Sequence, residues 1–434
     1  MDKMADVLGR AGAWCGQNKY LSAIKNAFQN FMPLTIAGAI GVLWCNVLVN
    51  DQTGLGLFFK PIMALDFLNP AFQAVNFCTI SCITVGITLG IAQEIGVWNM
   101  GAERAGYIPG LVGLAAWLSV TNTSHMVDGA KEAFTGIAGN ELGATGLFTG
   151  MIIGVLSVEL FCFFEKQDAL KIKMPEQVPP GVARAFEVLV PATITLIITA
   201  CIGSACYNLT GLYLNDVIKN GVQGPLGAVG ATVPGVMIIY LVIMLFWLVG
   251  IHGNNMLSAV KEALFTPLAL ENVEAFNKGE TPKNIINMYF LQMCGEFGGS
   301  GVTIGLVIAI MIFGKREDNK AIATLSLVPG LFNINETVTF GIPMVLNPIL
   351  GIPFVVAPLI TIIIGYVLTV IGFCPVACLT VPWTCPPIVF GFLACGANVM
   401  GAVTQAILIV VSTVIYTPFL IAYEKYQNKQ AAEA

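Results

Sequence analysis

Charge is the scarcest property of this 434-residue chain. Only 10% of its residues are charged, whereas 56% are hydrophobic. A soluble domain typically carries about 25% charged residues. A soluble enzyme of this length would be unable to cover its surface with so few charges. The composition therefore excludes a soluble protein and predicts one that lies in a lipid bilayer.

Positive charge is not concentrated anywhere in the chain. The formal net charge is −5 at pH 7, and the lysines are scattered. Binding to a nucleic-acid backbone needs a clustered basic face. The sequence therefore excludes nucleic acid as a partner.

The chain also lacks the cysteine spacing of a metal or redox motif. Most of its 12 cysteines lie in apolar runs, and none forms a CxxC pair. We interpret them as small hydrophobic residues of a membrane core, and we expect no disulfide framework, metal site or cofactor. Residues 1–19 are mixed and polar without an apolar h-region, so no cleavable signal peptide is predicted.

Long apolar runs are abundant. A helix that crosses the hydrocarbon layer needs about 20 largely apolar residues, and nine runs meet or approach that length. They lie near 33–50, 76–93, 107–121, 144–163, 187–209, 234–250, 301–314, 343–373 and 402–422. Proline and glycine interrupt the run at 343–373, which is expected to hold more than one element. The pattern predicts an all-α polytopic membrane protein with about ten transmembrane helices.

Two amphipathic stretches flank the predicted spans. Residues 17–31 carry apolar side chains at helical spacing and are expected to form an interfacial helix. Residues 168–186 form the second stretch, which the Pro179-Pro180 pair breaks before the next span.

Lysine and arginine predict the orientation, because cytoplasmic loops are enriched in them. The basic groups lie at 19–25, 166–184, 315–320 and 425–429. All of them can face one side if five spans separate the N-terminus from the second half of the chain. Both termini are therefore expected to be cytoplasmic.

Two ionisable residues stand alone in long uncharged stretches. Glu336 is the only Asp, Glu, Lys, Arg or His in 321–423, and His252 is the only one in 220–260. A charge at membrane depth costs at least about 2.5–3.5 kcal/mol, so each side chain needs polar neighbours or water. The alternative is a satisfied group at a helix end near the interface.

Both residues lie where the helical pattern breaks. Glu336 ends the segment 330–336, which contains Asn333 and Asn335, and His252 lies in Gly-Ile-His-Gly-Asn-Asn at 250–255. Gly-Gly-Ser-Gly at 298–301 is a third break. Irregular backbone at membrane depth is tolerated only inside protein or along a water-filled cavity, and broken helices hold the substrate in transporters. The breaks predict a binding cavity.

The residue types at the breaks indicate the ligand. Asn, His, Glu, Thr and Trp occur there without Lys or Arg, which argues for a neutral substrate rich in hydroxyl groups. Trp383 can offer its apolar face to a sugar ring and its N–H to a hydroxyl; the alternative is an anchor at the membrane interface.

These segments together resemble the membrane-embedded IIC component of the sugar phosphotransferase system, in its lactose/cellobiose/diacetylchitobiose branch. The matching stretches are 23–28 with 32–35, 178–186, 250–253, 298–301, 332–336 with 347–348, and 382–384. They run in the expected order over nearly the whole chain. Asn254-Asn255 is more polar than the usual pair there, and 94–106 matches nothing in the family pattern.

The resemblance implies two transmembrane halves. Residues 1–210 would form about five spans and dimerise, and 211–434 would hold a disaccharide such as cellobiose, diacetylchitobiose or lactose, with two re-entrant hairpins completing the site. Carried over by motif, His252 and Glu336 are the candidate catalytic residues and bind the sugar near the hydroxyl to be phosphorylated. The candidate substrate-binding residues are His252, Gly253, Asn333, Asn335, Glu336 and Trp383.

The family also implies a partner and a location. A phosphorylated cysteine on a separate IIB protein would donate its phosphoryl group to the sugar at the cytoplasmic face of the bacterial inner membrane. Glu336, shielded from water, would be the general base, with His252 positioning the hydroxyl. Basic residues in 166–184 and 315–320 would dock that partner, or would only set the orientation.

A proton-coupled sugar symporter remains the alternative, because protonation of a buried Glu or His can also gate movement. It would take up sugar without a phosphoryl donor. A passive channel fits less well, because it needs a continuous polar pore, whereas here the polar residues are concentrated at a few breaks.

Overall fold

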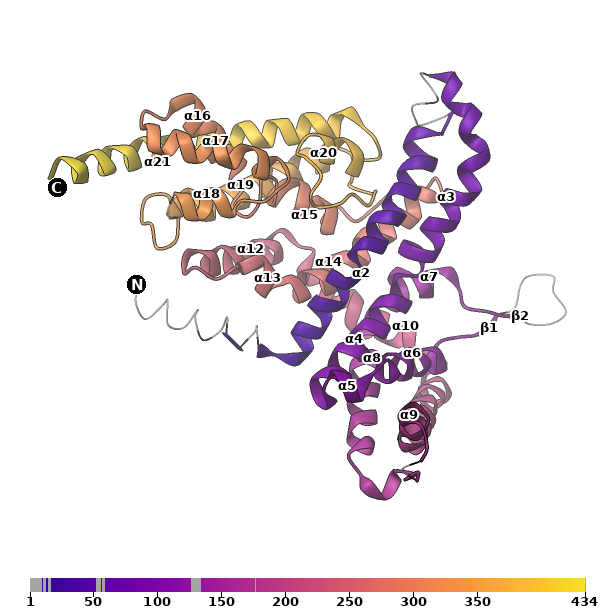
Figure 1. Ribbon diagram of the computed structural model, residues 1–434. Coiled ribbons are helices and arrows are strands. Elements are labelled where there is room, and N and C mark those ends of the chain that lie inside the picture. Colours follow the sequence, from indigo (N-terminus) through magenta and orange to yellow (C-terminus); the bar gives the residue numbers. More distant parts are fainter. Residues whose placement is uncertain are drawn as a thin grey trace. The chain divides into compact units, whose positions relative to one another are not determined.

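The computed structural model describes residues 10, 13–14, 17–51, 56, 59–125, 134–175, 177–342 and 344–433, leaving out the side chain of residue 228. Most of residues 1–19, on which the absence of a signal peptide was predicted, lie outside this part. The described residues are almost entirely helical, and the one strand pair among them is β1 (Ser124–His125) against β2 (Phe134–Thr135) (Figure 1). The predicted all-α fold is confirmed.

The chain divides into two compact units. We call Gln17–Thr35 with Phe77–Gly227 the N-terminal unit, and Ile36–Asn76 with Ala228–Ala434 the C-terminal unit. The prediction of halves at 1–210 and 211–434, with dimerisation by the first, stays a prediction.

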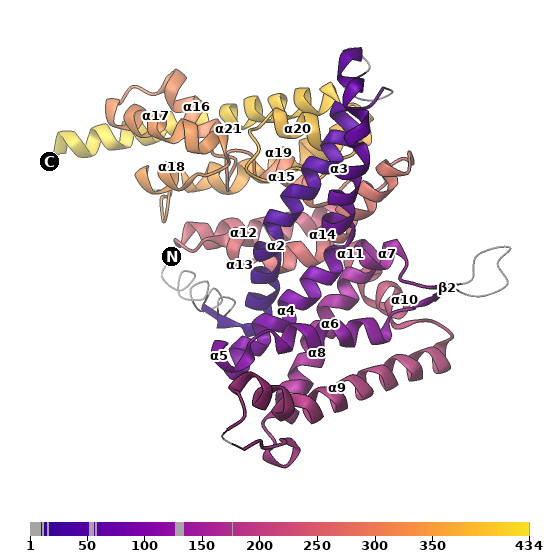
Figure 2. The same ribbon diagram turned by 45° about the vertical axis from the view of Figure 1, so that its right-hand side comes forward.

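The N-terminal unit is a bundle in which α4 (Ile83–Met100), α6 (Ile108–Val120) and α8 (Ala144–Glu165) pack against one another. Helix α9 (Pro180–Thr210) lies along α6 and α8 (Figure 2). Short elements connect these helices: η4 (Phe77–Ser81), α5 (Ala102–Ala105), α7 (Gly139–Leu142), η5 (Asp168–Leu170), α10 (Leu214–Ile218) and η6 (Lys219–Gln223).

Helix α2 (Lys19–Leu43) and helix α11 (Gly224–Gly230) each run from one unit into the other in sequence. The first segment of the C-terminal unit continues with η1 (Trp44–Leu48), η3 (Lys60–Leu68) and α3 (Asn69–Asn76). Residues 17–31 therefore do not form a separate interfacial helix as predicted. They are the start of α2, which passes through Pro33 without ending.

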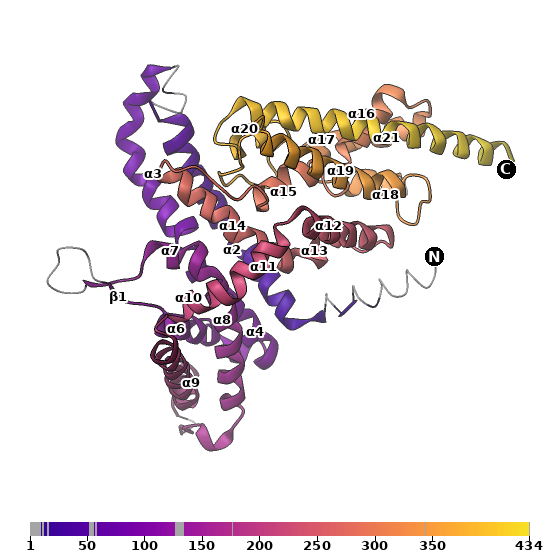
Figure 3. The same cartoon turned by 180° about the vertical axis from the view of Figure 1, so that it is seen from behind.

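The larger part of the C-terminal unit carries the breaks. Its helices are α12 (Val233–Leu248), α13 (Gly253–Met256), α14 (Ser258–Asn277), α15 (Met288–Gly295), α16 (Ile304–Phe313), α17 (Glu317–Leu331), α18 (Glu336–Gly341), α19 (Gly351–Val370), α20 (Val389–Ala394) and α21 (Val399–Glu433). Helix α16 packs against α17 and α21, and α19 packs against α12, α15 and α21 (Figure 3). Their shared core includes the fully buried side chains of Tyr240, Trp247 and Phe354.

Within the described residues, five helices are long and apolar enough to cross a membrane, or six if the pair Lys60–Ser81 and Ile83–Met100, bent by 41°, is one span. The five are Lys19–Leu48, Ala144–Glu165, Pro180–Thr210, Gly351–Val370 and Val399–Glu433. Three shorter apolar helices, Ile108–Val120, Val233–Leu248 and Ile304–Phe313, coincide with other predicted runs. This agrees roughly with the expected ten spans.

The second amphipathic stretch is interrupted before the proline pair. Of residues 168–186, only η5 and the start of α9 are helical. Pro180 occupies the first turn of α9, where its missing N–H costs nothing and its fixed φ favours the helix, and Pro179 precedes it with extended ψ of 138°. The span therefore begins at the proline pair, where the chain was predicted to break.

Candidate functional site

The candidate site lies where α12, α13, α15, α18 and the segment before α20 leave regular helix. Five non-glycine residues in the described chain have positive φ, and all of them lie in the C-terminal unit: Val302, Asn333, Leu346, Ile388 and Ala397. Such conformations cost energy unless the surroundings hold them. The surrounding structure of this unit therefore holds the backbone in these conformations.

His252 connects the end of α12 to α13 and faces Glu336. Its Nδ1 accepts a hydrogen bond from the backbone N–H of Asn255 at 3.2 Å, so a neutral ring carries its proton on Nε2. That Nε2 lies 3.7 Å from Oε1 of Glu336. Trp247 packs against the His252 ring at 4.4 Å between centroids, which fixes the ring's orientation.

Gly253 permits the close approach that places His252. A Cβ at this position would lie 2.0 Å from the carbonyl oxygen of Ile243 in α12. Any side chain would push α13 away from α12. Gly253 therefore contributes to the site by allowing this close contact between the backbones of α12 and α13.

Glu336 begins α18 and is only partly covered by the protein. Its side chain is 48% exposed, and that of His252 is 35% exposed. The protein by itself therefore does not enclose the Glu336 side chain, and its shielding from water stays a prediction. This exposure leaves room for a ligand beside the two side chains.

Asn333 ties three breaks together. Its left-handed backbone (φ 62°) lets Nδ2 donate to the carbonyl oxygens of Trp383 and Cys385 at 2.5 and 3.1 Å. Its Oδ1 accepts from the backbone N–H of Gly298 at 2.6 Å. Both amide hydrogens are thereby used on the frame of the site.

Asn335 holds the Gly-Gly-Ser-Gly turn. The side chain is buried and donates from Nδ2 to the Ser300 carbonyl at 2.7 Å. Asn254 donates to the Ser300 hydroxyl at 3.0 Å, so the asparagine that departs from the family pattern also binds this turn. A Cβ on Gly299 would lie 2.6 Å from Cβ of Asn335, and only glycine allows this contact.

Trp383 lies between α19 and α20 and is 42% exposed. Its carbonyl is held by Asn333, while part of its ring remains accessible. The structure thus links the six predicted residues through one set of contacts. Their assignment as sugar ligands or catalytic groups stays a prediction.

A buried ion pair near His252 was not predicted from the sequence. Lys261 Nζ pairs with Oε1 of Glu296, and the two side chains are 8% and 17% exposed. The Tyr240 hydroxyl donates to the same oxygen at 2.8 Å. The signal was present: Glu296 lies two positions before the glycine-rich turn at 298–301, and Lys261 is the first residue beyond the stretch 220–260.

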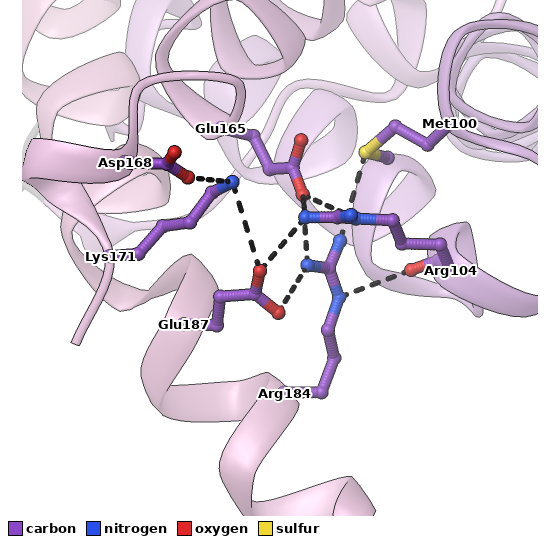
Figure 4. Close-up of polar contacts among 7 residues, drawn as sticks. All are labelled: Met100, Arg104, Glu165, Asp168, Lys171, Arg184 and Glu187. Atoms are coloured by element: carbon purple, nitrogen blue, oxygen red, sulfur yellow. Dashed lines mark hydrogen bonds and ion pairs between the residues drawn. The ribbon is translucent and has the colours of Figure 1, made fainter. Parts of the chain in front are cut away.

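Two of the basic residues in 166–184, Lys171 and Arg184, pair with carboxylates of the N-terminal unit. Arg184 Nη1 contacts Glu165 Oε1 and Glu187 Oε2 at 2.9 and 2.8 Å, and Arg104 Nη2 contacts Oε1 of both glutamates at 2.8 Å (Figure 4). Lys171 pairs with Asp168 at 3.0 Å. The cluster joins α5, α8 and α9 and accounts for Arg104 in the stretch that matched nothing in the family pattern.

The second basic group, 315–320, is likewise partly paired. Arg316 Nη2 lies 2.6 Å from Oδ2 of Asp318, and the hydrogen bond from Arg316 holds the pKa of that carboxyl below its usual value. The backbone N–H of Lys315 donates to Glu424 at 2.9 Å. Docking of a protein partner at either basic group stays a prediction.

Comparison with known proteins gives one consistent result. A family model described as "Phosphotransferase system, EIIC" matches residues 25–358. The oligo-beta-mannoside-specific EIIC component of Bacillus subtilis is 32% identical over 98% of this chain and 94% of that protein. The cellobiose-specific EIIC component of Lactococcus lactis is 30% identical over 98% of each.

A solved structure is similar over nearly the full length. The crystal structure of ChbC, the IIC component from the N,N'-diacetylchitobiose-specific phosphotransferase system, has a TM-score of 0.88 to this chain. It shares 29% sequence identity, and the match covers 97% of both chains.

Proposed function

Because the chain belongs to the phosphotransferase-system EIIC family, we propose that it binds a disaccharide such as cellobiose, diacetylchitobiose or lactose and presents it to a phosphorylated IIB protein. It is a multi-pass membrane permease, and IIC components work with a IIB partner. The names of the similar proteins support a saccharide. Membership in this family gives no support to the proton-coupled symporter.

The spacing of His252 and Glu336 carries the proposal. Their facing atoms are 3.7 Å apart, too far for a direct hydrogen bond. A hydroxyl oxygen beside the pair, off the line that joins the two atoms, can lie about 2.8 Å from both. It would accept the Nε2 proton of His252 and donate its own proton to Glu336, which is the arrangement that a general base requires.

The phosphoryl transfer follows from this arrangement. The hydroxyl oxygen attacks the phosphorus of the phosphocysteine on the IIB protein while its proton passes to Glu336. The sulfur–phosphorus bond breaks, and the cysteine leaves as a thiolate. His252 holds the attacking oxygen in line, because positioning supplies much of the catalysis in phosphoryl transfer.

The polar surroundings favour a neutral substrate. Lys261 is neutralised by Glu296 and covered by protein, so it does not offer a charge to an anionic ligand. Trp383 has an accessible ring, which suits the apolar face of a sugar. Gly253, Asn333 and Asn335 shape the site in this proposal, and they contact the sugar only where their backbone is accessible.

Further parts of the proposal concern assembly and orientation. We infer a homodimer formed through residues 1–210 and a bacterial inner-membrane protein with both termini in the cytoplasm. The distribution of Lys and Arg supports the orientation. The family resemblance supports the dimer.

The proposal is tested in proteoliposomes with phosphorylated IIB protein inside and radiolabelled disaccharide outside. We expect sugar phosphate to accumulate only when the IIB protein is present. Glu336→Gln should lower the transfer rate about 10²–10⁴-fold, the usual range for loss of a general base. Glu280→Gln, a change at an exposed carboxylate outside both basic groups, is the matched control and should leave the rate unchanged.

A different outcome decides against it. Concentrative uptake of unmodified sugar that needs only a pH gradient would overturn group translocation and restore the symporter. Binding of a sugar without any transfer from IIB to that sugar would overturn the assigned substrate class.

A further inference from the structure

Two thiols that are distant in sequence meet in the C-terminal unit. Sγ of Cys374 lies 3.9 Å from Sγ of Cys395, 21 positions later in the chain. From the sequence, both cysteines were expected to be small hydrophobic residues of the core. Both are almost fully buried, at 1% and 3% exposure.

The backbone around the pair explains why they meet. Cys374 follows the end of α19, and Cys395 follows the end of α20. The backbone N–H groups of Cys378 and Leu379 both donate to the carbonyl oxygen of Ala394, at 2.7 and 3.1 Å. These bonds draw the start and the end of the intervening segment together beside the two sulfurs.

Other groups hold the sulfurs in place without separating them. The Cys395 thiol lies 3.8 Å from the sulfur of Met293. The thiols of Cys374 and Cys395 both reach the carbonyl oxygen of Pro375 at 3.4 Å. The two sulfurs lie 3.9 Å apart and must approach one another to the bond length of about 2.05 Å that a disulfide requires.

The segment between the two cysteines carries part of the candidate site. It contains Trp383, and it also contains both carbonyl oxygens, of Trp383 and Cys385, that accept hydrogen bonds from Asn333. A covalent link between its ends would close this segment into a loop and restrict its conformations.

We propose that Cys374 and Cys395 form a disulfide under peroxide and that this bond restrains the loop bearing Trp383. Hydrogen peroxide oxidises one thiol to a sulfenic acid and releases one water. The neighbouring thiol then attacks the sulfenic sulfur, the S–S bond forms and a second water leaves. Two electrons pass from the thiols to the peroxide, and a thiol reductant reverses the reaction.

Burial sets the rate of this reaction. The first step is slow because the oxidant must enter a packed interior, whereas the second is fast because the partner thiol is already in contact. Bulky alkylating reagents should therefore react with the exposed Cys201 well before either member of the pair.

The link itself is measured without any sugar, so its failure is distinguishable from failure of the proposed function. Purified protein in detergent is treated with hydrogen peroxide and then denatured in the presence of iodoacetamide, which alkylates the remaining free thiols. It is digested without reduction. Mass spectrometry is expected to find the Cys374–Cys395 peptide pair, absent after treatment with dithiothreitol. Both cysteines fully alkylated, or a link from Cys374 to Cys378, would overturn the proposal.

The effect on the loop, which rests on the proposed function, is measured as transport in the proteoliposomes described above. The protein is oxidised and freed of peroxide before reconstitution, so that the cysteine of the IIB protein never meets the oxidant. Transport by the wild type is then expected to fall about fivefold or more, with recovery when the oxidised protein is first treated with dithiothreitol. Cys374→Ser and Cys395→Ala should each be insensitive, while Cys201→Ser should respond as the wild type does. A linked protein that transports at the unoxidised rate would contradict restraint of the loop.

Discussion

At the residue scale, half of the residues predicted to touch substrate form the frame of the site instead. The side-chain amides of Asn333 and Asn335 donate hydrogen bonds to neighbouring segments, and Gly253 permits a close backbone contact. His252, Glu336 and Trp383 keep accessible surface. The six residues therefore divide into three that build the site and three that face a ligand.

Replacing Gly253 with alanine should disturb the site without touching the sugar. The added Cβ would meet the Ile243 carbonyl, and such overpacking typically destabilises a protein by about 1–3 kcal/mol. Thermal unfolding should report a lower midpoint, and transfer activity should fall. Gly181→Ala, where a Cβ meets open space, is the control; equal effects of the two changes would refute the close-contact argument.

Trp383→Ala should weaken sugar binding about tenfold, because a lost ring contact of this kind is worth about 1.4 kcal/mol. Trp383→Phe keeps a ring and should lose much less. Isothermal titration with the disaccharide measures both. An unchanged affinity in the alanine variant would assign Trp383 to the membrane interface instead.

At the element scale, buried charge connects helices that sequence spacing treats separately. The Lys261–Glu296 pair joins α14 to the turn after α15, and Tyr240 adds α12. Breaking such a pair strands a buried charge and costs about 3–5 kcal/mol, whereas replacing both partners can be nearly neutral.

This gives a double-mutant test of the pair. Lys261→Met and Glu296→Gln are each expected to lower the unfolding midpoint strongly, and the double variant should recover most of the loss. Unfolding in detergent, followed by intrinsic fluorescence, measures all four proteins. Additive losses would mean that the two charges do not stabilise one another.

The ion cluster of Figure 4 allows a matched comparison between two glutamates that share the same arginines. The Glu165 side chain is 3% exposed and that of Glu187 is 29% exposed. Because water screens the more exposed charge, Glu165→Gln should lower the unfolding midpoint more than Glu187→Gln. The reverse order in the same unfolding assay would contradict a burial-dependent contribution.

At the scale of the whole molecule, the membrane sets the architecture. The polar backbone must be satisfied within helices wherever lipid surrounds it, and the long apolar helices comply. Within the described residues, every non-glycine position with positive φ lies in the C-terminal unit, which carries the candidate site.

Dimerisation is the prediction that belongs to this scale. Multi-angle light scattering in detergent should give a protein mass of about twice the chain's 46.1 kDa. The measurement uses the full chain, and glutaraldehyde cross-linking serves as an independent measure. A protein mass of one chain over the whole concentration range would refute the homodimer.

The amino-acid sequence by itself determined the membrane location, the helical class and the positions of nearly all apolar helices. These follow from local quantities, namely the length of an apolar run and the absence of charge within it. The isolation of His252 and Glu336 in uncharged stretches was visible for the same reason. The motif order was enough to indicate the family.

Only the tertiary structure decided which distant residues meet. The 3.7 Å approach of His252 to Glu336, the Lys261–Glu296 pair and the Cys374–Cys395 contact depend on how breaks in separate helices pack. The continuation of α2 through Pro33 likewise could not be read from the amphipathic spacing, whereas the helical start at Pro180 follows from the local preference of proline for the first turn. Spacing along a chain constrains neighbours one or two turns apart, whereas these contacts join positions tens of residues apart through the core.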